Sequence, residues 1–185
     1  MTLRPLAAAV ALTSALTLSA CSSDDPDPVV ADPTPSAPSS SVDPTPTEEM
    51  AEPWEEKTDA GAVAFVDHWL DLLNEAELSG DTGDLREASG KGCVACVSIS
   101  SSIDDTYGAG GWMKSTGWQL TEAGAPSDIG KNRLAIAANI DIPQQSVKSS
   151  STSSIDRNKA SQNTLSFEVT WSGGAWRLTS LETVA

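Results

Sequence analysis

Residues 58–77 read TDAGAVAFVDHWLDLLNEAE and decide how the folded part of the chain begins. Apolar side chains recur here at spacings of three and four, and acidic ones fill the opposite side of the helical wheel, which predicts an amphipathic helix. Thr58 or Asp59 can cap its start, and Gly80 suits the left-handed turn that ends it. The apolar positions are Val63, Phe65, Val66, Trp69, Leu70, Leu72, Leu73 and Ala76.

Two shorter helices follow this one. Residues 81–89 carry Leu85 and Ala88 at a spacing that turns both inward, and the glycines around Lys91 end this segment. From Cys96 to Tyr107, apolar residues again recur every three or four positions, with serines and aspartates between them. A glycine cluster then stops the pattern. The chain therefore begins its folded part with about three helices.

After residue 111 the hydrophobic period changes from about three and a half to two. Residues 133–142 and 165–171 alternate apolar and polar side chains, which is typical of half-buried strands. Gly173-Gly174 supplies turn residues, so residues 165–178 predict a hairpin, and residues 118–121 predict a further strand. We expect an α+β fold in which about three N-terminal helices pack on a curved antiparallel sheet of about four strands. Residues 143–160 are expected to form a long mobile loop.

The segment that precedes this domain has a different composition. Residues 22–57 contain eight of the eleven prolines, ten acidic side chains and a single base, Lys57. Such a segment has too few apolar side chains to form a core, and proline extends it toward polyproline II. We interpret residues 21–57 as a lipidated cysteine followed by a disordered tether of at most about 110 Å, and residues 58–185 as one domain.

The first twenty residues have the pattern of an export signal. Arg4 precedes an uncharged apolar run that is too short for a good membrane span, and Leu18-Ser19-Ala20-Cys21 resembles a bacterial lipobox. We expect residues 1–20 to be removed as a lipoprotein signal peptide and Cys21 to carry the lipid, palmitate included. The alternative is a plain secretory signal in which Cys21 has no role. Either address lies outside the cytoplasmic membrane, and lipidation predicts a lipid-anchored cell-envelope protein.

The charge of the chain excludes some classes of partner. Removal of residues 1–20 takes away one of the 11 basic side chains and none of the 26 acidic ones, which leaves a formal charge of −16. Nucleic-acid binding needs clustered lysine or arginine, so we expect no nucleic acid as a partner. A basic patch for anionic lipid is equally unexpected. The membrane contact is then the lipid on Cys21 alone.

Cys93-Val94-Ala95-Cys96 is the other strong motif. An exported location favours an oxidised pair, so we predict a Cys93–Cys96 disulfide at the start of the third helix. Thiol–disulfide exchange is the alternative, because a cysteine at a helix start can have a lowered pKa, but no thioredoxin-like strand–helix–strand pattern surrounds it. Zinc needs four ligands, and the domain offers two cysteines and one histidine. We expect no metal and no cofactor.

The residues from Phe65 to Trp118 resemble those of a family of uncharacterised actinobacterial lipoproteins with a CxxC motif. The resemblance is carried by Phe65-Val66, Trp69, Leu73-Asn74, Gly80-Asp81-Thr82, Leu85-Arg86, Ser89, Cys93, Cys96, Tyr107, Gly110-Gly111 and Trp118. The order of elements is also similar to the cone-shaped fold of nuclear transport factor 2-like and SnoaL-like proteins. That resemblance implies a pocket between helices and sheet. The fold includes enzymes and binding proteins, so it implies no reaction.

Within such a cone we place a possible ligand pocket beside Tyr107, Trp112 and Trp118. His68 is the only histidine and a candidate general base, but it lies at the border of the polar face of its helix. We predict no catalytic residue. The sequence favours a non-catalytic binding module for an envelope protein or small ligand. The alternative is a SnoaL-like enzyme, which a deep pocket with a perturbed polar residue would favour.

Overall fold

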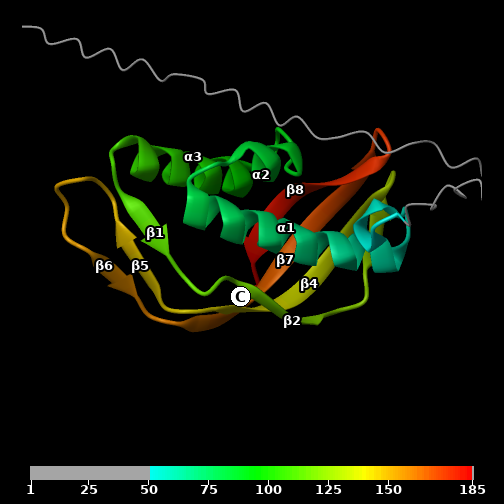
Figure 1. Ribbon diagram of the computed structural model, residues 1–185. Helices are drawn as coiled ribbons and strands as arrows, with labels where there is room; N and C mark the ends of the chain where they lie inside the picture. Colours follow the sequence, from blue (N-terminus) through cyan, green and yellow to red (C-terminus); the bar gives the residue numbers. More distant parts are fainter. Residues whose placement is uncertain (1–50, 185) are drawn as a thin grey trace, which may run out of the picture. The chain divides into compact units, whose positions relative to one another are not determined.

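The structure is a computed structural model that describes residues 51–184. The predicted signal peptide, Cys21 and all but the last residues of the predicted tether lie outside the described residues. The described chain runs through a short 3₁₀ helix, three α-helices and eight strands (Figure 1). No helix among the described residues has both the length and the apolar character needed to cross a membrane.

The first α-helix, α1, spans Asp59–Ser79 as the 58–77 pattern predicts. The Thr58 hydroxyl caps it by accepting a hydrogen bond from the Gly61 amide at 2.9 Å, which satisfies one of the unpaired donors of the first turn. The helix ends at Gly80, whose φ of 82° is left-handed. A Cβ atom there would lie 2.5 Å from the Tyr107 ring, so both backbone and packing require glycine.

The chain just before α1 is already part of the packed domain. A 3₁₀ helix, η1, spans Pro53–Glu55. The Trp54 ring stacks on His68 of α1, with centroids 4.2 Å apart and the planes 2° from parallel, and the Trp176 indole donates to the Glu56 carbonyl at 2.8 Å. Residues 53–57 were predicted to belong to the tether. The structure instead stacks Trp54 on His68 of α1 and joins the Glu56 carbonyl to Trp176 of the C-terminal strand, because the Trp54 ring gives this segment apolar surface to bury.

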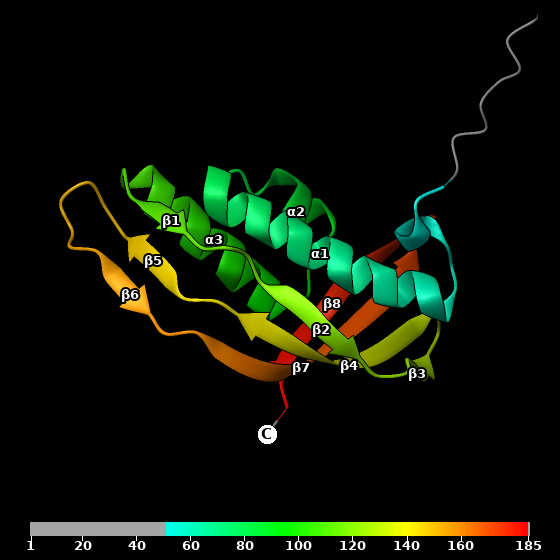
Figure 2. The ribbon, with the colours of Figure 1, turned by 60° about the horizontal axis from the view of Figure 1, so that its bottom comes forward.

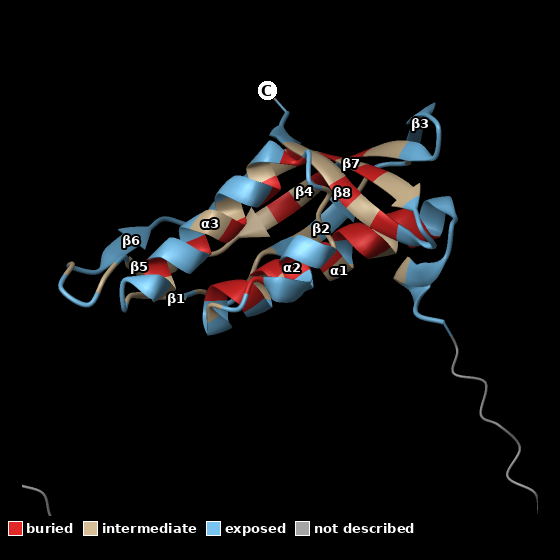
Figure 3. Cartoon of the chain, turned by 90° about the horizontal axis from the view of Figure 1, so that it is seen from above, coloured by how far each residue is buried: buried red, intermediate tan, exposed pale blue. Residues whose placement is uncertain are grey.

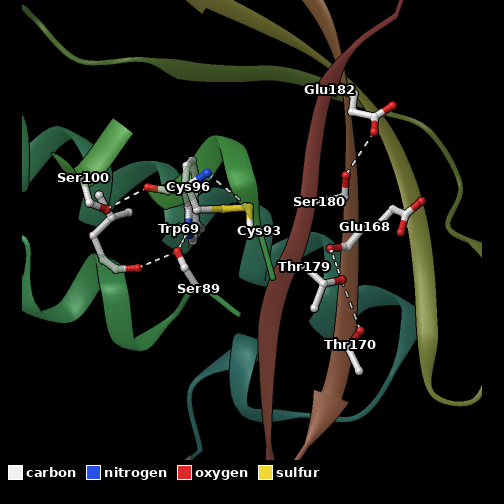
Figure 4. Close-up of a disulfide and its surroundings, with 11 residues drawn as sticks. Trp69, Ser89, Cys93, Cys96, Ser100, Glu168, Thr170, Thr179, Ser180 and Glu182 are labelled. Atoms are coloured by element: carbon white, nitrogen blue, oxygen red, sulfur yellow. Dashed lines mark hydrogen bonds between the residues drawn. A yellow bond between two sulfur atoms is a disulfide. The ribbon is translucent and has the colours of Figure 1, made fainter. Parts of the chain in front are cut away.

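Two shorter helices cover the same side of the sheet as α1: α2 at Gly83–Glu87 and α3 at Val94–Gly108. Cys93 is the N-cap of α3 and is joined to Cys96 in a disulfide, with Cα atoms 5.3 Å apart. Figure 4 shows this bridge beside Trp69. Both half-cystines are buried, at 0% and 1% exposed. An attacking thiol cannot reach either sulfur without local opening, which favours a structural role over thiol exchange.

The larger sheet has five antiparallel strands: β2 (Gln119–Ala123), β3 (Ser127–Gly130), β4 (Arg133–Ile142), β7 (Ser161–Ser172) and β8 (Ala175–Thr183). Their order is β2-β4-β7-β8, and β3 also pairs with β4. Opposed pairs such as Ile136 and Phe167 are buried in the core. The predicted hairpin at Gly173-Gly174 joins β7 to β8, and both glycines have positive φ.

A smaller sheet corrects the expectation for residues 143–160. β1 (Trp112–Lys114), β5 (Gln145–Lys148) and β6 (Asp156–Asn158) pair in the order β1-β5-β6. The segment therefore forms a hairpin rather than a structureless loop. Its serines and glutamines show no apolar alternation, and its pairing with β1, more than thirty residues earlier, supplies the strand structure. We call this three-stranded sheet the arm.

The predicted fold class, α+β with three helices on an antiparallel sheet, is confirmed, although within residues 51–184 the larger sheet has five strands rather than about four and the arm adds three more. The arm lies at the end of the domain where α1 finishes, and η1 lies at the end where α1 starts (Figures 1 and 2). Buried residues run along the facing sides of the helices and strands (Figure 3). This core contains Trp69, Leu70 and Leu73 from α1 and Phe167, Val169 and Leu178 from the sheet.

Candidate functional site

A cavity of about 540 Å³ opens between α1, α3 and the arm. Its apolar wall contains Leu73, Ile99, Ile103 and Met113. Its polar lining comprises Glu77, Ser98, Ser102, Thr106, Gln145, Ser149, Asp156 and Asn158, and Trp118 lies against both kinds of side chain. We call this space the arm cavity. Its volume lies within the range that is usual for small-molecule sites, roughly 300–1,000 Å³.

Glu77 is the buried acid of the arm cavity. It lies in the last turn of α1 and is 9% exposed. Burial raises the pKa of the Glu77 carboxyl above its ordinary value of 4.5, because the charged form loses hydration. The Gln145 amide donates to both carboxylate oxygens, at 3.2 and 3.0 Å, and opposes part of this rise. The contact ties the arm to α1.

Trp118 is held beside Glu77 by Asn74. The Asn74 side chain accepts a hydrogen bond from the Trp118 amide at 2.7 Å and donates to the Trp118 carbonyl at 3.0 Å. The Trp118 indole also lowers the pKa of Glu77 slightly. Its Nε1 atom is nevertheless buried and meets no acceptor at full hydrogen-bond geometry within the described chain. The Gln145 bonds are therefore the larger of the two contacts that lower the pKa of Glu77.

Of the three aromatic residues predicted for a pocket, Trp118 alone lines the arm cavity. The Tyr107 hydroxyl instead faces the carbonyls of Glu77 and Leu78, at 2.8 and 2.9 Å, and fastens the end of α1 to α3. Trp112 lies outside the lining, with the Lys114 ammonium 4.9 Å from its ring centroid. These two placements differ from the prediction because Tyr107 is used to close the carbonyl end of α1 and Trp112 lies on the β1 edge.

Sequence reasoning missed Glu77 and Gln145. A signal for Glu77 was present, because it follows Leu73 by four residues and so falls on the apolar face of α1. A buried acid at such a position needs a partner. Nothing in the sequence marked Gln145, since the segment around it was expected to be a loop. The candidate base His68 lies away from this cavity, stacked on Trp54.

The chemistry of the arm cavity is that of one buried carboxyl group. Glu77 and the exposed Asp156 are its titratable lining residues. No group of three or more metal-ligating side chains occurs among residues 51–184. The cavity can accept an apolar body against Ile99, Ile103 and Met113 and offer hydrogen bonds from its hydroxyl and amide groups. Glu77 holds its proton to a higher pH than an exposed glutamate does, because burial raises its pKa.

Glu77→Gln should change how stability depends on pH. An acid with a raised pKa in the folded state stabilises the fold below its unfolded pKa, and that stabilisation is lost as pH rises through the folded pKa. The variant stays neutral and can pair amide to amide with Gln145, so its stability relative to the wild type should increase from about pH 4.5 upward and then level off. Urea unfolding at a series of pH values measures this difference. Glu75→Gln, at an exposed site on the same helix, controls for the loss of a carboxylate. If the difference in unfolding free energy between Glu77→Gln and the wild type did not change with pH, the prediction would be contradicted.

Comparison with solved structures gives a likeness of fold. The chain is similar to the intermembrane space region of the chloroplast protein ARC6, with a TM-score of 0.54, 14% identity, and 69% of this chain and 97% of that chain covered. It is also similar to Aln2 from a Streptomyces species, with a TM-score of 0.44, 9% identity, and 66% and 89% covered. An NTF2-like protein from Anabaena variabilis gives a TM-score of 0.36 at 6% identity, with 66% and 87% covered.

The sequence comparisons give a family without an assigned activity. A search of curated protein sequences gives no match. Residues 32–182 match the family of unknown function DUF6318. The match includes α1, the Cys93–Cys96 bridge, the arm and all of the larger sheet except the last residue of β8, and it begins inside the predicted tether. Because the match covers most of the sequence, this chain belongs to the DUF6318 family.

Proposed function

We propose that this chain is an extracytoplasmic lipoprotein whose domain binds a small amphiphilic ligand in the arm cavity. The lipid on Cys21 is the proposed anchor, supported by the Leu18–Cys21 motif and the apolar run before it. The acidic tether that follows holds the domain away from an anionic membrane surface. The domain is then a binding module at the cell envelope.

The observation that carries the binding proposal is the composition of the arm cavity. One side is apolar and the other presents the buried Glu77 and Gln145 pair. A ligand site of this size commonly combines apolar walls with a few fixed polar groups that orient the ligand. Asn74 holds Trp118, and Gln145 holds Glu77, so these groups are in place before a ligand arrives. Preorganisation of this kind favours binding.

The cavity also lies far from where the chain begins its folded part. Glu77 stands eighteen positions after Asp59 on α1, which corresponds to about 27 Å along the helix. Figures 1 and 2 place the arm and η1 at opposite ends of α1. The chain enters the domain at η1, so the point where the tether joins the domain does not obstruct the arm cavity.

An enzyme of the SnoaL-like kind is the second candidate, and one observation favours it. The raised pKa of Glu77 is the perturbed polar group that acid–base chemistry would need. Binding is preferred because Gln145 engages both Glu77 oxygens, and the other titratable lining residue, Asp156, is exposed at the cavity rim. The Gln145 bonds also stabilise the charged carboxylate, which makes Glu77 a weaker base toward a substrate proton.

Native mass spectrometry of the full-length chain, purified in detergent from its own cells, tests the proposal. The expected result is a retained small-molecule mass. Ser102→Tyr places a ring at the cavity lining and should abolish the retained mass, whereas Asp105→Tyr on the same exposed side of α3 is outside the lining and should keep it. A bare protein mass in all three forms would overturn the binding proposal. Conversion of the retained molecule during incubation would favour the enzyme.

A further inference from the structure

A second cavity lies at the opposite end of α1 from the arm. It has a volume of about 650 Å³ and lies between η1, α1, α2 and the start of β8. Phe65, Leu72 and Ala88 give it an apolar floor, and the stacked Trp54 and His68 rings form one wall. We call this space the edge groove, because residues 174–177, at the turn into β8, line its other side.

The strand that borders the edge groove has an unpaired backbone edge. In the β7–β8 hairpin, Trp171 faces Trp176. The Trp171 amide donates to Asn132 on the β4 side, at 2.8 Å, so this pair does not exchange hydrogen bonds across the hairpin. The Trp176 amide and carbonyl must then point away from β7. Within residues 51–184 neither group has a backbone partner outside the hairpin.

Two residues further along β8, the same outer edge is paired with residues 88–90. The Leu178 amide donates to the Ala88 carbonyl at 3.0 Å, and the Leu178 carbonyl accepts from the Gly90 amide at 2.8 Å. Ser89 and Leu178 thus form a parallel bridge. This pairing stops at residue 88, where the chain passes back into α2. The outer edge of β8 is therefore competent to pair. Its first part is Trp176, which lines the edge groove, is 4% exposed and has no backbone partner outside the hairpin within the described residues.

The charges around the edge groove are mainly negative. The acids Glu55, Asp84 and Glu87 line it, and all three are exposed. Arg177 is the one guanidinium in the lining, and it donates to the carbonyl of Glu87. A basic segment that enters the groove would meet three carboxylates, whereas an acidic segment would be repelled. This charge pattern decides which occupant fits.

We propose that the edge groove binds an extended basic segment of another envelope protein, which adds a strand to β8 at Trp176. Main-chain hydrogen bonds to Trp176 would give affinity, and alternate side chains would enter the apolar floor. Lysine or arginine side chains at the positions between these, which point to the opposite face of the added strand, would meet Glu55, Asp84 and Glu87. Residues 22–50 of the tether do not fit, because they carry seven acids and no base, and a second copy of a chain with a net charge of −15 is repelled for the same reason.

Binding of a labelled lysine–valine alternating peptide to the full-length chain in nonionic detergent tests this proposal. The Trp176 amide should exchange with solvent at least about tenfold more slowly when the peptide is bound, because the proposed strand occupies it. A glutamate–valine peptide should not bind. A lysine–valine peptide methylated on its backbone nitrogens should bind about tenfold more weakly, since it has lost its donors.

Paired substitutions separate the groove from the general acidity of the chain. Glu55→Gln with Glu87→Gln should weaken lysine–valine peptide binding by about tenfold. Glu75→Gln with Glu122→Gln removes the same charge from exposed sites outside the groove lining and should leave affinity unchanged. Equal losses in both pairs, or binding that leaves Trp176 amide exchange unaltered, would show attraction to the acidic surface in general and overturn the proposal.

Discussion

Trp69→Ala is expected to lower the free energy of unfolding by about 3–5 kcal/mol, the usual cost of removing a fully buried tryptophan. Trp69 is 0% exposed and its indole donates to the Ser89 hydroxyl at 3.0 Å. The substitution therefore opens a cavity and also removes a partner of Ser89, which itself donates to the Leu85 carbonyl. With total stabilities of about 5–15 kcal/mol in ordinary domains, the loss is a large part of the whole.

Thermal and urea unfolding of the full-length chain measure this effect. For a domain of this size the midpoint should fall by roughly 10–20 °C. Trp112→Ala is the matched control, since Trp112 is only partly buried on β1, and it should cost less than about 1 kcal/mol. Near-equal costs for the two tryptophans would contradict the placement of Trp69 at the centre of the core.

Cys21→Ser is expected to abolish incorporation of labelled fatty acid and to leave the precursor uncut at residue 20. A diacylated cysteine supplies two chains at about 0.8 kcal/mol per buried methylene, enough for stable anchoring, while one chain holds a protein only marginally. Serine has no thiol to carry the thioether-linked lipid. Because Cys93 and Cys96 are paired in a buried bridge, Cys21 is the one cysteine left for this modification.

Growth with labelled palmitate, followed by mass analysis of the N-terminal fragment, measures both effects. Ser22→Ala, one residue beyond the proposed cut, should be labelled and cut as the wild type is. Cleavage of Cys21→Ser at the wild-type position, or a wild-type chain that carries no fatty acid, would show an ordinary secretory signal and remove the proposed membrane anchor.

Much of the fold was predictable because its signals are local. The apolar period of residues 58–77 and the capping residues Thr58 and Gly80 predicted α1, and the structure begins and ends this helix close to those positions. The two-residue alternation of residues 133–142 predicted β4, and Gly173-Gly174 predicted the turn into β8. In each case one face of a single element had to be buried, so a local pattern carried the information.

The arm was not predictable in this way. Residues 145–148 and 156–158 have no apolar alternation, and they are strands because β1 offers β5 a hydrogen-bonding edge. The candidate site depends on the same contact, since Gln145 reaches Glu77 across 68 positions of sequence. Of the predicted pocket residues, Trp118 reached the cavity because Asn74 holds its backbone there, while Tyr107 closes the end of α1.

The sequence by itself determined the helices, four of the five strands of the larger sheet, the cysteine motif and the acidic charge of this protein, because each follows from neighbours within one element or from composition. Only the tertiary structure decided the arm, the burial of Glu77 and the packing of Trp54 on His68. These features come from pairs of residues far apart in the chain, whose desolvation and hydrogen bonding exist only after the elements have packed.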